Sequence, residues 1–323
     1  MPEAGPGFFA RIRDFAFAYG FYLLLAGLVL LFTIISNSFL TLSNWTQISI
    51  AACFLLAASS GLTLVLITGN IDLSIGSIAY LAASVVFLTA DYPPAISIAA
   101  ALTAGIVIGL INGLLVAYLK MNALLTTLGL LIAYRGISLV LTGGTVQKVS
   151  DGMAALGEVK FFEWLPLVFV ISLVLMIILQ LVLSRTRFGA YCYAIGNDEA
   201  AAEKIGIPVR QVKTAAFCIS GASAAVSGIL LSMYLGEVTT FTGRGMEFQA
   251  VAAVVIGGTS LFGGRGNVLP GTLAGVLLLI IINNGLGTRG VSPFVYPFVA
   301  GTLIFIAIYL DSLKNRKSAA NGA

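Results

Sequence analysis

Three polar segments interrupt an otherwise apolar sequence, and they hold most of the residues that could do chemistry. The first, GNIDLSIG at 69–76, places the carboxylate of Asp72 two residues before the hydroxyl of Ser74. The second, 185–212, is rich in charged residues, and its composition differs abruptly from that of its neighbours. The third, VVIGGTSLFGGRGNVLPG at 254–271, is dense in glycine and has one cation. Carboxylates, hydroxyls and cations are therefore present, but in no familiar catalytic arrangement.

The residue inventory excludes several kinds of site. No histidine occurs in the 323 residues, which rules out Ser-His-Asp and Cys-His catalysis, His-ligated zinc and proton transfer by imidazole. The three cysteines, Cys53, Cys192 and Cys218, form no C-x-x-C pair, so we expect them to pack rather than to bind zinc or form disulfides. A Walker A loop needs Gly-Lys-Ser/Thr, and none of the seven lysines follows a glycine. The sequence predicts no catalytic residue, no metal ligand and no ATPase motif.

The elements that must position these segments follow from composition. Only 9% of residues are charged and 59% are apolar, with a mean hydropathy of +1.04, whereas a soluble domain carries about 25% charge. An all-α polytopic membrane protein is therefore expected. Because a charge at mid-bilayer is costly and about 20 residues cross the bilayer, the intervals between charges predict about ten transmembrane helices. These intervals are 17–36, 47–68, 73–90, 92–119, 122–142, 164–184, 214–236, 248–264, 266–288 and 290–310.

The distribution of cations predicts the orientation. With the N-terminus inside, the inner segments hold twelve of the seventeen Lys and Arg residues, as the positive-inside rule requires. Both termini are then cytoplasmic, with short tails at 1–16 and 311–323, and the chain 1–323 forms a single transmembrane domain without a cleaved signal. The pI near 9.0 does not indicate nucleic acid, because the cations are dispersed between apolar spans.

The largest inner loop, 185–212, contains a short helix signal. Asn197 or Asp198 can cap a helix whose body is 199–205, since acids stand in its first turn and a lysine stands near its end. Gly206 terminates this helix and Pro208 blocks its continuation. A short helix on the cytoplasmic face would suit docking of a partner protein. A solvated connector is the competing interpretation.

Polar residues in or near the spans are the remaining candidates, because polar groups are costly there. Asp72 or Ser74 can cap the span at 73–90, and either could instead take part in gating. For Asn112, Asn283 and Asn284 we weigh an interhelical hydrogen bond against contact with a transported solute. For two further candidates, Arg135 and Glu247, an anchor at the membrane interface is the alternative. Glycines at small-xxx-small spacing, such as Gly105, Gly109 and Gly113, predict close helix packing.

Four motifs, taken together, resemble the ribose-type permease family of bacterial ABC importers. They are GNIDLSIG, the pair Arg135-Gly136, the loop TRFGAYCYAIGNDEAAAEKIGI, and the run MEFQAVAAVVIGGTSLFGGRGNVLPGTLAGVLLLIIINNGL. They occur in the family's order and spacing over nearly the whole chain. The resemblance implies the binding-protein-dependent permease subunit of the bacterial plasma membrane, which is a transporter and not an enzyme.

The resemblance also implies the partners and the site. Two ABC ATPase subunits, which bind ATP and Mg, would lie inside, an extracytoplasmic sugar-binding protein outside, and a second permease copy, identical or not, beside the chain in membrane lipid. This chain would bind no cofactor. The ATPase-coupling loop would comprise Arg185, Arg187, Gly196, Asn197, Asp198, Glu199, Ala200, Ala201, Lys204 and Gly206. Candidates for the pathway or its gate are Asp72, Ser74, Asn112, Arg135, Glu247, Asn283 and Asn284, and the glycine-rich turn contributes Gly257, Gly258, Gly263, Gly264 and Arg265.

The implied activity is import of a monosaccharide such as ribose, xylose, arabinose or galactose. Permeases for an autoinducer sugar, a nucleoside or a branched-chain amino acid are the near alternatives. An ion-coupled secondary transporter is a more distant one, because it ordinarily needs a titratable or sodium-binding site at the membrane midplane and the sequence suggests none. An intramembrane enzyme would need a catalytic pair that this sequence does not supply.

Overall fold

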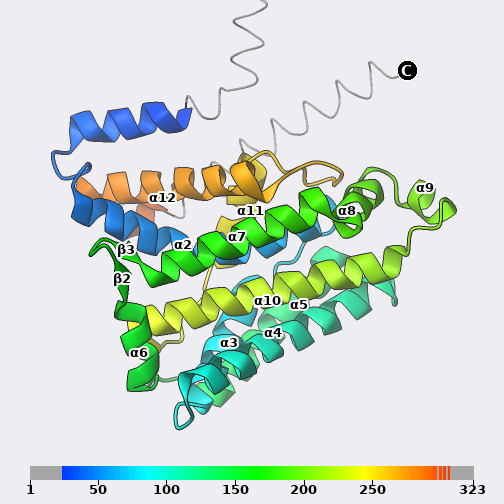
Figure 1. The fold of residues 1–323 in the computed structure, drawn as a ribbon, viewed down its shortest axis with the longest axis horizontal. Coiled ribbons are helices and arrows are strands. Elements are labelled where there is room, and N and C mark those ends of the chain that lie inside the picture. Colours follow the sequence, from blue (N-terminus) through cyan, green and yellow to red (C-terminus); the bar gives the residue numbers. More distant parts are fainter. Residues whose placement is uncertain (1–23, 297, 300, 303–304, 306–323) are drawn as a thin grey trace, which may run out of the picture.

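The computed structural model describes residues 24–296, 298–299, 301–302 and 305, and its elements are helices with two small strand pairs (Figure 1). The long helices are α2 (Leu42–Ile67), α4 (Pro94–Ala117), α5 (Ala123–Thr142), α7 (Leu167–Arg185), α10 (Val209–Leu235) and α12 (Leu273–Thr288). The shorter ones are an unlabelled helix (Leu24–Ile35), α3 (Ile75–Leu88), α6 (Asp151–Glu158), α8 (Arg187–Asn197), α9 (Glu199–Lys204) and α11 (Met246–Ile256), with single turns η1 (Val268–Thr272) and η2 (Pro293–Val295). β1 (Gln147–Lys148) pairs antiparallel with β4 (Glu237–Val238), and β2 (Lys160–Phe161) with β3 (Leu165–Pro166).

Among the described residues, six helices are long and apolar enough to cross a membrane, and the sixth includes η1. They match six of the predicted intervals. Two further intervals, 73–90 and 248–264, instead contain the short helices α3 and α11, with 14 and 11 residues. At 1.5 Å per residue these are about 21 and 16 Å long, which is less than the ~30 Å hydrocarbon layer. The expectation of full-length spans there is wrong. The intervals at the two ends of the chain lie partly outside the described residues, so the count of ten stays a prediction.

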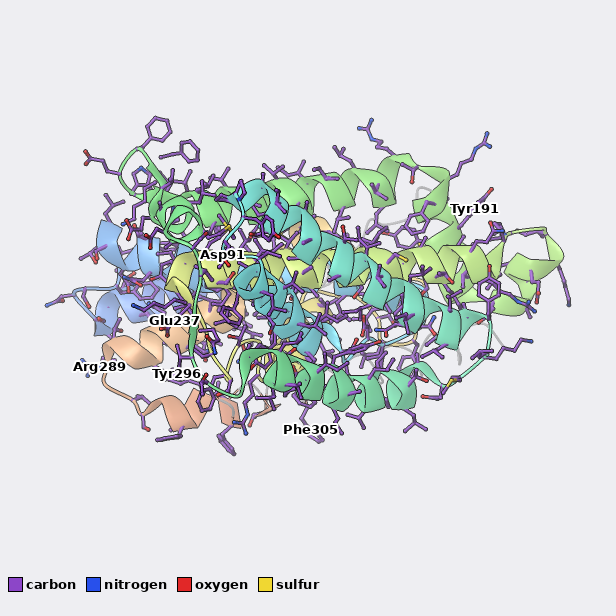
Figure 2. The ribbon with its side chains drawn as sticks, turned by 90° about the horizontal axis from the view of Figure 1, so that it is seen from below. Asp91, Tyr191, Glu237, Arg289, Tyr296 and Phe305 are labelled. Carbon is purple, nitrogen blue, oxygen red and sulfur yellow. The ribbon has the colours of Figure 1, made fainter. Side chains whose placement is uncertain are left out.

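The long helices lie roughly along one axis, and the predicted inner and outer segments separate to its two ends (Figure 1). α9 lies at one end and α6 at the other (Figure 1). Asp91, Glu237 and Arg289, all predicted to be outside, lie toward the end opposite Tyr191 of the charged 185–212 segment (Figure 2). We therefore call the α9 end the inner end and the α6 end the outer end.

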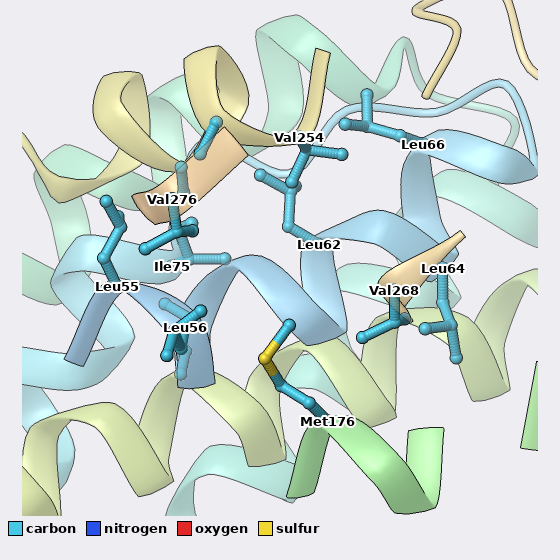
Figure 3. Packing of buried hydrophobic residues seen from close by; sticks show 14 of the residues in the cluster. Leu55, Leu56, Leu62, Leu64, Leu66, Ile75, Met176, Val254, Val268 and Val276 are labelled. Atoms are coloured by element: carbon cyan, nitrogen blue, oxygen red, sulfur yellow. The ribbon is translucent and has the colours of Figure 1, made fainter. Parts of the chain in front are cut away.

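α2 is the central helix of the bundle. Its residues from Leu55 to Ile67 are buried almost without interruption, and α7, α10, α11 and α12 pack around it. Figure 3 shows Leu56 and Leu62 of this helix among side chains from the neighbouring elements, including Met176 and Val276. A helix that is apolar all round belongs in the interior of a bundle, and α2 is placed accordingly.

α10 packs closely against α4, as the glycine spacing predicts. A methyl group added at Gly105, Gly109 or Gly113 would overlap backbone or Cβ atoms of α10. Small residues let the two helix backbones approach. This contact brings the middle of α10 next to the start of α3, where the first polar segment lies.

Candidate functional site

The 185–212 segment is mostly helical at the inner end. α9 forms where its signals place it: the Asp198 side chain accepts a hydrogen bond from the Ala201 amide at 3.0 Å, and Gly206 follows with a left-handed φ of 83°. α8 precedes it and buries Cys192 and Ile195 in the same core as α2. The interpretation as a solvated loop is wrong for α8. The next helix begins at Val209 rather than near 214, because Pro208 is tolerated just before the first helical turn.

An ion pair connects α9 to α10. The Nζ of Lys213 donates to the Oε2 of Glu199 at 2.6 Å. The Lys213 side chain is 11% exposed and that of Glu199 is 55% exposed. Glu199 is thus not simply a solvent-facing residue free to contact a partner. Sequence reasoning missed Lys213, because the chain turns between the two residues and no helical spacing relates them.

The other coupling candidates on this end are exposed. Arg185 ends α7, Arg187 begins α8, and Ala200 and Lys204 lie on α9. Directly after α9, Ile205 is 76% exposed. The free face of α9 therefore offers both charge and an apolar side chain.

The glycine-rich turn packs against the ends of α2 and α8. The amide of Gly264 donates to the carbonyl of Ile67 at 2.9 Å, and the Tyr193 hydroxyl donates to the carbonyl of Gly266 at 2.7 Å. A methyl group at Gly196 would overlap both Ile67 and Gly264. In a phosphate-binding loop the backbone amides point at the ligand, whereas the Gly264 amide here donates to a carbonyl of the protein. The turn joins α2 to α8 in the 185–212 segment.

The rest of this turn is also packed. A methyl at Gly257 would overlap the carbonyl of Gly271 in η1, and one at Gly263 would lie 2.9 Å from the Cα of Gly69. Gly258 adopts a φ of 97°, and the Arg265 carbonyl accepts from the Ser260 amide at 3.0 Å. These residues therefore position the polar segments around them.

A cavity of 470 Å³ opens at the inner end beside the ion pair. It lies between the 69–71 segment, the α4–α5 connection, α9 and the start of α10. Its charged lining residues are Lys120, Glu199, Glu203, Arg210 and Lys213.

A chain of buried hydrogen bonds ends on Asp72. The Ser74 amide and hydroxyl donate to its Oδ1 at 3.0 and 2.6 Å, and the Ser220 hydroxyl of α10 donates to its Oδ2 at 2.9 Å. The Asn112 amide of α4 donates to the Ser74 hydroxyl at 2.8 Å, and the Tyr134 hydroxyl of α5 donates to the Asn112 oxygen at 2.9 Å. Every donor in the chain points toward the carboxylate. The Asp72 carboxyl group therefore connects groups from α3, α4, α5 and α10.

This Asp72 cluster (Asp72, Ser74, Asn112, Tyr134 and Ser220) combines three predicted candidates with two that sequence reasoning missed. Asp72 performs the capping interaction at the start of α3, while Ser74 makes no side-chain cap bond. Asn112 forms interhelical bonds. Tyr134 is adjacent to the candidate Arg135, but nothing in the sequence distinguishes its hydroxyl from the many others. Its partner, Asn112, is known only from the packing of α4, α5 and α10.

Arg135 and Glu247 lie near the inner end of α3. The Arg135 guanidinium donates to the carbonyls of Thr240 and Thr242 at 3.4 and 3.5 Å and lies 5.6 Å from the centre of the Tyr80 ring. Glu247 is only 5% exposed, and its Oε2 packs on Gly76 without a hydrogen-bond partner among the described residues. The interpretation of Glu247 as an exposed interface anchor is therefore wrong.

The last candidates lie on α12. The amides of Asn284 and Asn44 exchange two hydrogen bonds at 3.0 and 2.9 Å, which join α12 to the outer part of α2. Asn283 is half-buried. Among the described residues neither Asn283 nor Asn284 forms a hydrogen bond with the Asp72 cluster, so the structure does not combine all the predicted candidates into one hydrogen-bonded site.

Comparisons with known proteins identify the family of the chain. The family model described as "Branched-chain amino acid transport system / permease component" matches residues 44–308. The chain is 36% identical over 293 residues to the "Ribose import permease protein RbsC" of Bacillus subtilis, which covers 89% of this chain and 90% of the relative. It is 34% identical over 300 residues to RbsC of Escherichia coli K12, with 89% and 91% covered. It is also 34% identical over 284 residues to the "Autoinducer 2 import system permease protein LsrC" of Photorhabdus luminescens, with 87% and 85% covered. No solved structure gave a significant match.

Proposed function

The chain belongs to the branched-chain amino acid transport system / permease component family, and on that premise we propose that it is the membrane-spanning subunit of an ABC importer for a monosaccharide. Its relatives are named as permeases for ribose and for autoinducer 2. Permeases of such importers are multi-pass proteins of the bacterial plasma membrane, and they work with an ATPase and a binding protein. The chain is a transporter component of this kind.

Another small solute is the alternative substrate, because the family description names branched-chain amino acids. An ion-coupled secondary transporter is not favoured, since the relatives are import permeases. The sequence suggests no titratable or sodium-binding site at the membrane midplane, but the structure buries two acids, Asp72 and Glu247, which are 0% and 5% exposed, so that argument alone no longer excludes it. The case against a secondary transporter therefore rests on the family assignment.

We further propose about ten helices within the membrane layer in one domain over 1–323, of which α3 and α11 do not cross its full thickness, with both termini cytoplasmic. Two copies, identical or not, would enclose the pathway, with two ATPases inside and a sugar-binding protein outside. ATP and Mg would bind only to the ATPases, because this chain has no Walker A lysine.

The exposed face of α9 is the observation that carries the coupling proposal. α9 lies at the inner end beyond the helix bundle (Figure 1), and the Glu199–Lys213 ion pair joins it to α10. Seven residues further along α10, Ser220 donates to Asp72. A movement of the ATPases would thus reach the Asp72 cluster through one rigid helix. Such a movement would bias a two-state pathway between its inward and outward forms.

Reconstitution tests the proposed function. Liposomes that contain this chain alone should hydrolyse no ATP and accumulate no sugar, whereas the complex with its ATPase and binding protein should concentrate one monosaccharide from a panel that includes ribose. Accumulation by the chain alone, driven by an ion gradient, would contradict the assignment.

Charge reversal on α9 tests the coupling. Glu203→Lys changes an exposed residue that pairs with no cation among the described residues, while Glu199→Lys also breaks the ion pair. If α9 docks in the ATPase, Glu203→Lys should reduce ATPase co-purification without loss of insertion. Lys213→Glu should partly restore stability to Glu199→Lys. Full uptake by both single variants would make α9 a connector only.

A further inference from the structure

A small cavity of 160 Å³ lies between α2, α11, α12 and the 241–246 turn that leads into α11. Phe54 of α2 and Ile280 of α12 form part of its apolar wall. Phe241 and Arg244 of the turn and Gln249 of α11 supply its ring and polar groups. None of these three belongs to the candidates already described. We call these residues the turn cavity.

The turn cavity lies deep in the membrane layer. The backbone of Gly243 touches that of Gly76, the second residue of α3. α3 runs from there toward the outer end over 14 residues, or about 21 Å. The turn therefore reaches roughly 20 Å below the outer end of α3, well into a hydrocarbon layer of ~30 Å. Non-helical backbone at such depth is tolerated only where it is buried in protein or lines water.

The polar side chains of the turn cavity form no ion pair or hydrogen bond with other described residues. Arg244 is exposed, and its guanidinium lies 5.7 Å from the centre of the Phe241 ring. Among the residues that the structure describes, Arg244 makes no ion pair and the Gln249 amide makes no hydrogen bond. An exposed arginine facing lipid at this depth costs a few kcal/mol or more. This face consequently meets water or a solute rather than acyl chains.

The residue types select the chemistry of that solute. Arg244 donates hydrogen bonds, Gln249 both donates and accepts, and Phe241 and Phe54 offer flat apolar faces. No carboxylate lines the cavity to bind a cation. A cavity of about 150 Å³ holds one six-membered ring such as benzene, so the volume suits a single small ring. These features match a neutral polyhydroxylated ring.

We propose that the turn cavity is a weak contact site for the transported monosaccharide, with Arg244 and Gln249 as its hydrogen-bonding groups and Phe241 as its ring contact. The inference rests on the proposed function for the identity of the solute. It adds residues that neither the family motifs nor the Asp72 cluster supply. Few unsatisfied groups would bind the sugar weakly, so that release is not retarded.

Cysteine labelling tests whether the site is wet, whatever the solute is. In the complex, with the three native cysteines replaced by alanine, Phe241→Cys and Gln249→Cys should react with a small charged thiol reagent. Ile132→Cys is the control, because Ile132 of α5 is 68% exposed on an apolar face that we assign to lipid. It should not react. Unreactive cysteines at both test positions would overturn the proposal.

Uptake measurements test contact with the sugar. Gln249→Ala and Arg244→Ala should each lower the initial uptake of the sugar carried by the wild-type complex about three- to tenfold, the effect of one lost hydrogen bond. Gln249→Asn should restore part of it, and ATPase co-purification should be unchanged. Reactive cysteines with wild-type uptake in both alanine variants would refute the sugar contact. If the wild-type complex imports none of the sugars, the proposed function fails, while labelling still decides whether the cavity lines a pathway.

Discussion

Replacing Asp72 by alanine would remove the acceptor on which the buried hydrogen-bond chain ends. Three donors lose their partner in the Asp72→Ala variant: the Ser74 amide, the Ser74 hydroxyl and the Ser220 hydroxyl. Each buried donor left unsatisfied costs about 1–3 kcal/mol. Even at the lower limit the folded state loses roughly 3 kcal/mol. At about 2 °C per kcal/mol for a large domain, the unfolding midpoint should fall by roughly 6 °C or more.

The Asp72→Asn variant is the discriminating comparison. Asparagine keeps an oxygen for both Ser74 donors, and the Ser220 hydroxyl can rotate to accept from the new amide. The number of bonds is kept and only their strength changes, which we expect to cost roughly 1 kcal/mol. The midpoint should then fall by about 2 °C. Both stability changes are expected in detergent as well as in lipid, because the cluster is fully buried in the protein.

Fluorescence-detected size-exclusion chromatography after stepwise heating measures these midpoints on the purified complex. Ser220→Ala removes one donor to the cluster, and Ser184→Ala is its matched control on an exposed position at the end of α7. Only the former should lower the midpoint. An Asp72→Ala midpoint within 1 °C of wild type, or a larger loss for Asp72→Asn than for Asp72→Ala, would refute the reasoning.

Three further outcomes are expected. Gly228→Val should abolish accumulation of folded protein, because even one methyl group at Gly228 overlaps the Ala79 backbone. Gly129→Ala should be tolerated, because a methyl group there meets open space. The yield of detergent-soluble protein measures both outcomes. Gly206→Val should strain a φ of 83° by about 1–2 kcal/mol and reduce ATPase co-purification, and unchanged co-purification would contradict a role for the α9 end. A single cysteine at Asn197 should be shielded from an impermeant external thiol reagent, and a single cysteine at Asp151 should react with it. The reverse pattern would invert the predicted topology.

Local sequence signals predicted where several helices lie along the chain. The lengths of the uncharged runs predicted six of the membrane-crossing helices, because burial of a charge in hydrocarbon is costly wherever the neighbours lie. Asp198 and Gly206 likewise predicted both ends of α9, since capping involves atoms only a few residues apart. The motif resemblance predicted the family that the comparisons show.

The tertiary structure alone decided which polar groups meet. Ser220 reaches Asp72 across 148 positions, and Lys213 reaches Glu199 only after the chain has turned between α9 and α10. The uncharged intervals gave no sign that α3 and α11 stop short, because apolar composition does not record where a helix ends. The burial of Glu247 follows from the contact of its turn with Gly76. Apolar patterning sets how deep a segment lies, but the partner of each buried polar group depends on how the helices are placed beside one another.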